Sequence, residues 1–97
     1  MSDRKLKTVI GIARNKGISG KIQNSDRLNK RFKITLKSGV SIHFGLWPFA
    51  GKGTFIDHKD EKIKKAWRAR HSKIMKDGKS AYKNPNSAEY YSWNLLW

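Results

Sequence analysis

The chain has 97 residues and a formal net charge of +15, because 22 lysines and arginines stand against only seven aspartates and glutamates. It contains no cysteine, which excludes disulfides and cysteine-based zinc sites. No apolar run approaches the roughly 20 residues that a membrane-spanning helix needs, so we expect no membrane span. Such a charge favours an anionic partner, which is nucleic acid, the acidic surface of another protein or an anionic membrane, the last being the weakest of the three.

The first thirty residues are basic and rich in polar residues. Residues 8–13 form a short apolar run with alternating character, and they predict an edge strand or an extended arm because Gly11 weakens a strand interior. Residues 15–26 hold two glycines among polar residues and predict a loop. We therefore expect residues 1–30 to form an extended basic N-terminal arm.

Residues 31–44 predict a β-hairpin with one apolar face, since apolar and polar residues alternate on both sides of the turn at Ser38-Gly39. A lone hairpin is marginal in water, so this face needs a cover. The alternating apolar positions are Phe32, Ile34, Leu36, Val40, Ile42 and Phe44.

Residues 57–76 predict a basic amphipathic helix that covers the hairpin. Acidic residues at its front and cations along its body suit the helix dipole. Asp57 and Asp60 suggest a variant capping box at the start of the helix, and Asp77-Gly78 suggests its C-terminal end. The stripe predicted to face the core is Ile63, Ala66, Trp67, Arg70 and Ile74.

Cations cover the remainder of this predicted helix. A charge run of this kind is often only a solvated face, but the whole chain is basic, which favours a binding role. We predict that these residues contact a polyanion or an acidic protein partner. They are Lys62, Lys64, Lys65, Arg68, Lys73 and Lys76.

Aromatic residues concentrate in a glycine-rich loop, residues 45–53, and in the tail, residues 87–97. In the loop, the aromatic side chains either plug the core or project as an anchor into another protein. Asn84 as cap with Pro85 behind it predicts a short C-terminal aromatic helix, with one face inward and one face toward a neighbour. The predicted partner anchors are Trp47, Phe49, Tyr91, Trp93 and Trp97.

The sequence indicates binding and not catalysis. His43, His58 and His71 lack the spacing of a zinc site, and the acidic residues at the front of the predicted helix are explained by capping. No phosphate-binding glycine loop or nucleophile motif is present. We expect no enzyme activity, no catalytic residue, no metal, no cofactor and no small-molecule substrate.

Five short motifs occur in order along residues 31–97. They are Ile42-His43-Phe44-Gly45, His58-Lys59-Asp60, Arg70-His71, Asn84-Pro85 with Ala88, and Tyr90-Tyr91-Ser92-Trp93-Asn94-Leu95-Leu96-Trp97. Their order and spacing resemble a family of small basic proteins encoded by large icosahedral double-stranded DNA viruses, such as the chloroviruses and their relatives. The chain departs from that pattern at Trp93-Asn94, where the family tends to place a basic residue and then tryptophan.

The resemblance implies a protein of the virion or of the virus factory in the host cytoplasm. Together with the charge, it suggests a non-enzymatic minor capsid or cement protein that bridges capsid components with acidic surfaces. The alternative is a sequence-independent nucleic-acid-binding protein that tethers or condenses the viral genome. The expected fold is α+β, with residues 31–97 forming a domain of a hairpin covered by the basic helix and the short C-terminal helix. The run at residues 8–13 can join the hairpin as the third strand of a small sheet.

Overall fold

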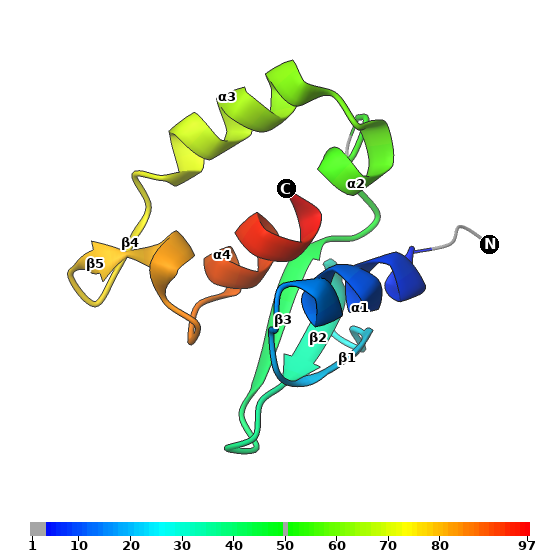
Figure 1. Ribbon diagram of the computed structural model, residues 1–97, viewed down its shortest axis with the longest axis vertical. Helices are drawn as coiled ribbons and strands as arrows, with labels where there is room; N and C mark the ends of the chain where they lie inside the picture. Colours follow the sequence, from blue (N-terminus) through cyan, green and yellow to red (C-terminus); the bar gives the residue numbers. More distant parts are fainter. Residues whose placement is uncertain (1–3, 50) are drawn as a thin grey trace. The chain divides into compact units, whose positions relative to one another are not determined.

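Helices and antiparallel strands occur in separate runs along the chain, and this confirms the predicted α+β class (Figure 1). The computed structural model describes residues 4–49 and 51–97. The chain divides into two compact units, Met1–Pro48 (unit 1) and Phe49–Trp97 (unit 2). Each unit has its own secondary structure and is considered by itself.

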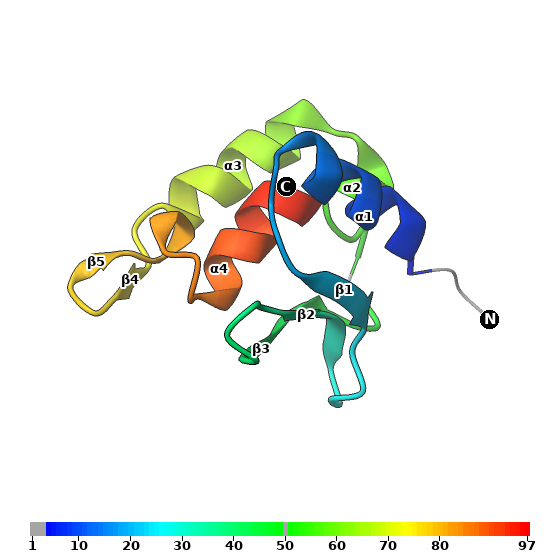
Figure 2. The same ribbon diagram turned by 60° about the horizontal axis from the view of Figure 1, so that its bottom comes forward.

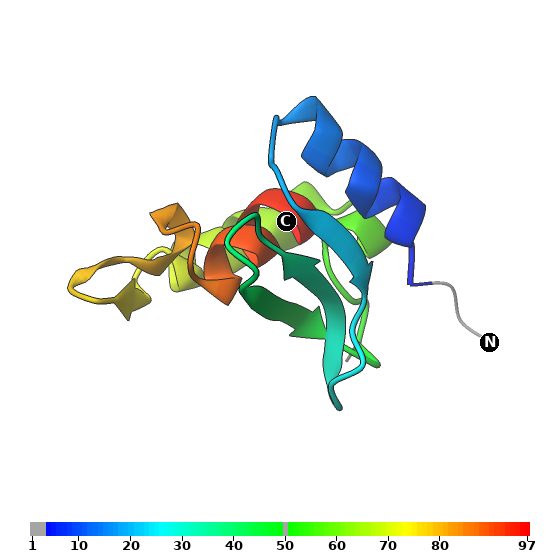
Figure 3. The same cartoon turned by 90° about the horizontal axis from the view of Figure 1, so that it is seen from below.

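Unit 1 is a three-stranded antiparallel sheet with one helix. Helix α1, Leu6–Asn15, precedes strands β1, Lys21–Asn24, β2, Lys30–Thr35, and β3, Ser41–Leu46. The sheet order is β1-β2-β3, so the chain meanders through neighbouring strands (Figure 3). The predicted hairpin is confirmed as β2 and β3.

Of the six predicted apolar positions, Phe32, Ile34 and Phe44 are buried on one face of this sheet, whereas Val40 precedes β3 and is exposed. Ile34 lies opposite Ile22 on β1, and Phe32 lies opposite Phe44 on β3 with ring centroids 5.8 Å apart. All four side chains are buried. A glycine is needed at position 20, just before β1, because its φ is +125° and a Cβ there would lie 2.8 Å from Cγ1 of Ile34.

The prediction for the N-terminal part was wrong. The run at residues 8–13 belongs to α1, which lies against β1 and buries Val9 and Ala13, four residues apart on one helix face. The predicted loop at residues 15–26 contains β1, the third strand of the sheet. The described part of residues 1–30 therefore contains a helix and a strand and is not an extended arm.

Unit 2 consists of short helices and a small hairpin (Figure 2). The hairpin is a two-stranded antiparallel sheet that projects beyond the end of α3. The elements are α2 (Phe55–His58), α3 (Glu61–His71), β4 (Met75–Lys76), β5 (Lys79–Ser80), the 3-10 turn η1 (Ala81–Lys83), α4 (Ala88–Tyr91) and the π-helical turn η2 (Ser92–Leu96).

The single helix predicted for residues 57–76 is in fact two helices and a strand. Lys59 has a φ of 59° and separates α2 from α3. The capping box joins Thr54 to Asp57 at α2, while Asp60 caps α3 by accepting hydrogen bonds from the backbone N–H groups of Lys62 (2.9 Å) and Ile63 (3.4 Å).

Helix α3 ends at His71, before the predicted stop. Asp77 and Gly78, with φ of 55° and 77°, instead form the turn between β4 and β5. Consecutive left-handed residues are what a tight two-residue hairpin turn requires, and Asp-Gly is a preferred pair there. The motif was recognised, but it connects strands and does not end a helix.

The predicted apolar stripe is narrower than expected. Ile63 and Trp67 are half-buried, whereas Ala66, Arg70 and Ile74 are exposed, and no residue of α3 is fully buried. The C-terminal helix is present but begins later than predicted, because Ser87 and not Asn84 is its N-cap. None of the helices in residues 4–49 and 51–97 is long and apolar enough to cross a membrane.

Candidate polyanion-binding surface

Trp67 lies at the centre of an aromatic cluster in unit 2. Its ring stacks on His71, one turn further along α3, with centroids 3.8 Å apart and planes 13° apart. On Trp97 it stacks at 4.7 Å and 9°, and Trp93 lies 5.9 Å away at 53°. The cluster therefore ties α3 to the C-terminal segment through its rings.

Cations lie over the outer rings of this cluster. The Cζ atom of Arg68 is 4.9 Å from the Trp93 centroid, and the side chain donates a 3.4 Å hydrogen bond to the Trp93 carbonyl. The Nζ atom of Lys64 is 4.4 Å from the Phe55 centroid. Arg68 and Lys64, both from the predicted set of contact cations, are thus engaged with aromatic rings inside unit 2.

His58 links the two helices at the other side of the cluster. Its ring lies 5.4 Å from Trp97 and 6.1 Å from Phe55. Its Nδ1 accepts a 2.9 Å hydrogen bond from the backbone N–H of Asp60. An accepting Nδ1 places the proton of a neutral ring on Nε2.

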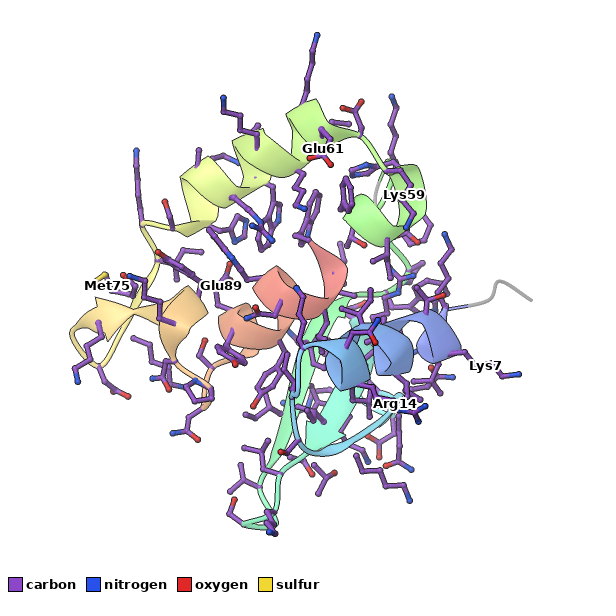
Figure 4. All side chains as sticks on the ribbon, viewed as in Figure 1. Lys7, Arg14, Lys59, Glu61, Met75 and Glu89 are labelled. Atoms are coloured by element: carbon purple, nitrogen blue, oxygen red, sulfur yellow. The ribbon has the colours of Figure 1, made fainter. Side chains whose placement is uncertain are left out.

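A second histidine connects α3 to α4. Nδ1 of His71 lies 2.6 Å from Oε1 of Glu89, near the start of α4 (Figure 4). The motif residues His58, Asp60, His71 and Trp97 therefore touch one another or cap helices within unit 2. Their spacing in the sequence is explained by the architecture of this unit.

The other four predicted cations are Lys62, Lys65, Lys73 and Lys76, and all four are exposed. Lys62 and Lys65 lie on α3, and Lys73 follows its end. Lys76 lies on β4 and donates a 3.2 Å hydrogen bond from Nζ to the carbonyl of Asn86. Sequence reasoning missed Lys59, which is exposed between α2 and α3 and is seen with Glu61 in Figure 4.

The predicted anchors do not form one exposed set. Trp93 and Trp97 are half-buried in the cluster. Trp47, in unit 1, is half-buried with the Cζ atoms of Arg4 and Arg31 at 5.0 and 5.2 Å from its ring.

Phe49 is 36% exposed, so it remains a candidate among the predicted partner anchors. Tyr91 is only 2% exposed, and its hydroxyl donates a 2.6 Å hydrogen bond to the Pro85 carbonyl. Burial raises the pKa of Tyr91, and the neighbouring Tyr90 adds to this. A side chain this buried has no surface for a partner, so Tyr91 is not an exposed anchor.

Unit 1 uses some of its charge internally. Arg31 is fully buried, and its guanidinium donates two hydrogen bonds to the carbonyl of Arg4, at 3.1 Å from Nε and 2.9 Å from Nη2. On the sheet, Nδ1 of His43 lies 2.7 Å from Oγ of Ser25. Burial and then the nearby Arg27 charge lower the pKa of His43 from its ordinary value.

No group of three metal-ligating side chains is assembled among the residues that the structure describes. Two of the acidic residues ahead of α3 act as caps instead. Asp57 accepts hydrogen bonds from the N–H and the hydroxyl of Thr54, and Asp60 caps α3.

The fold and this surface define a small basic α+β protein in which aromatic rings and some cations support the structure while many lysines stay exposed. The chain belongs to a family of unknown function (DUF5754), whose model matches residues 20–71, more than half of the chain. The match runs from β1 to the end of α3. Comparisons with curated proteins and with solved structures gave no match.

Proposed function

We propose that this protein is a non-enzymatic structural protein of a large double-stranded DNA virus particle, and that its basic surface binds the phosphate backbone of nucleic acid without regard to sequence. The observation that carries the proposal is the net charge of +15 together with exposed lysines on and after α3. Three of the exposed lysines, Lys62, Lys65 and Lys73, lie on α3 or directly after it.

The type of cation supports phosphate as the ligand. Lysine ammonium groups on flexible stems act as point charges that suit a phosphate backbone and do not read base edges. Protein–protein interfaces, by contrast, are depleted in lysine and enriched in aromatic residues and arginine. Here the tryptophans of unit 2 pack on one another and Arg68 lies over one of them. The exposed cations of α3 are Lys62, Lys65 and Arg70.

A second candidate is a minor capsid or cement protein that bridges acidic capsid proteins. The observation that favours it is a set of exposed apolar side chains in unit 1. Leu28 is 85% exposed, and Val40 and Leu46 are each 53% exposed. Leu46 pairs with Lys30 across the sheet and Leu28 lies in the loop before Lys30, so these two exposed leucines are at the same end of the sheet. Exposed apolar residues that lie close together suit a protein partner.

Both candidates place the protein in the virion, or in the host cytoplasm or virus factory during assembly. This placement rests on the resemblance to the viral family. The residues that carry the resemblance include His58, His71 and Trp97, which lie together in the aromatic cluster. In this chain, these three residues therefore share a structural role.

Filter binding to a duplex DNA over a salt series tests the first candidate. We expect log affinity to fall linearly with log salt, at about 0.9 per phosphate neutralised, and to be equal for duplexes of different sequence. The triple variant Lys62→Gln, Lys65→Gln and Lys73→Gln should reduce the slope by about 3, because each of the three lysines neutralises one phosphate in the wild type. A wild-type protein that ignores DNA, yet is cross-linked to capsid proteins in intact particles, would favour the second candidate.

A further inference from the structure

A lysine-lined pocket lies beside the β4–β5 hairpin of unit 2, away from the aromatic cluster. Its volume is about 460 Å³, within the usual range of small-ligand sites. One wall is the hairpin and the other is the turn that follows η1. The polar side chains that line it are Lys76, Asp77, Lys79, Ser80, Lys83 and Asn84.

Hydrogen bonds fix both walls of this pocket. The backbone N–H of Ala81 donates a 2.8 Å bond to the carbonyl of Ile74, which holds the two ends of the hairpin together. Lys76 bonds across to the carbonyl of Asn86, and the Tyr91 hydroxyl holds the carbonyl of Pro85. The pocket therefore has a defined shape although its lysines reach solvent.

The charge of the lining identifies the ligand class. Three lysines outweigh one carboxylate, Asp77, so the pocket attracts an anion. Ser80 and Asn84 add side chains that can donate hydrogen bonds to the oxygens of a bound phosphate. No aromatic ring is among the described residues that line the pocket, so it offers no stacking surface for a base.

We propose that this pocket binds a phosphodiester group of a nucleic-acid backbone, as a second contact beside the exposed lysines of α3. The inference rests on the proposed function and deepens it by naming a site. Nucleic acid is the source that fits best, because the hairpin projects from unit 2 and an extended backbone can pass along it (Figures 1 and 2). The labelled Met75 marks this hairpin in Figure 4.

The decisive variant is Lys79→Gln with Lys83→Gln, which leaves the hydrogen bonds of the walls in place. Its salt slope for duplex DNA should be lower than that of the wild type by about 2. The matched control, Lys7→Gln with Lys37→Gln, removes the same charge from unit 1 and should change the slope by less than half as much. Equal effects of the two variants would overturn the inference, because bulk charge alone would then explain binding.

Asp77→Asn tests the pocket because it should increase the affinity for duplex DNA. Asn tolerates the left-handed conformation of this turn, so the fold is kept while the one carboxylate in the lining is removed. Binding of duplex DNA should become roughly two- to five-fold tighter at low salt, the size expected for one exposed charge. An unchanged affinity would count against the pocket as a phosphate site.

Amide NMR with tripolyphosphate as the probe locates the site directly. In the wild type, the amide signals of residues 79, 80 and 84 should shift saturably as tripolyphosphate is added. In the Lys79→Gln, Lys83→Gln variant the same signals should stay unchanged, while a dispersed spectrum shows that the variant is folded. Shifts confined to α3 would overturn the inference.

Vesicles that contain a phosphoinositide distinguish a lipid headgroup from nucleic acid. Tighter binding to them than to DNA, abolished in the same variant, would overturn the assignment to nucleic acid. If the wild type binds duplex DNA and the pocket variant is indistinguishable from it, the inference falls and the proposed function stands. If the wild-type protein does not bind DNA at all, both the inference and the proposed nucleic-acid binding are wrong.

Discussion

Replacing Trp67 by alanine should destabilise unit 2 more than any other single change in its aromatic cluster. Trp67 stacks on both His71 and Trp97, and its ring is tilted against that of Trp93. Each such pair contributes about 0.5–1.5 kcal/mol beyond the burial of area. Because Trp67 is only half-buried, we expect a loss of about 2–3 kcal/mol in the free energy of unfolding and not the full cost of a buried tryptophan.

Urea unfolding followed by near-ultraviolet circular dichroism measures this loss, since the signal comes from packed aromatic rings. The matched control is Trp67→Phe, which keeps a ring in the stack and should lose about half as much. Alanine has the higher helix propensity, so a loss cannot be assigned to the helix itself. If Trp67→Ala lowers the free energy of unfolding by less than about 0.5 kcal/mol, the cluster does not hold α3 to the C-terminal segment.

Two further predictions concern capping and pH. Asp60→Ala should destabilise unit 2 by about 1 kcal/mol in urea unfolding, because the N–H of Lys62 is left without its acceptor, whereas Asp60→Asn should restore most of the stability; equal losses in the two variants would contradict the capping role. The pKa of His43 is lowered, so the unfolded chain takes up a proton first, and the stability that His43 contributes is present above its ordinary pKa of 6.5 and is lost as the pH falls. Between about pH 7 and about pH 5, the free energy of unfolding should therefore fall more in the wild type than in His43→Gln. An equal fall in the two proteins would mean that folding does not lower the pKa of His43.

The β2–β3 hairpin was predictable because its signal is local. Alternation with period two fixes which residues share a face, and Phe32, Ile34 and Phe44 are buried as expected. The run at residues 8–13 misled because β-branched residues favour strands, while its buried positions, Val9 and Ala13, follow helical spacing. The four-residue spacing of Val9 and Ala13 therefore indicates a helix, although Gly11 lies between them.

The break between α2 and α3 and the aromatic cluster were harder to foresee. Lys59 adopts a left-handed conformation that lysine rarely takes, and nothing in the composition marks it. The stack of Trp67 on Trp97 and the pair of His71 with Glu89 join residues 30 and 18 positions apart. Such pairings depend on the path of the chain between them, which hydrophobic periodicity alone does not specify.

The placement of the four tryptophans has a practical consequence. Trp47 is the tryptophan of unit 1, close to the guanidinium groups of Arg4 and Arg31, whereas the other three lie in the cluster of unit 2. Indole fluorescence responds to its immediate surroundings, so replacing Trp47 by phenylalanine leaves an emission that reports on unit 2. Unfolding of unit 2 can thus be followed in that variant without an attached dye.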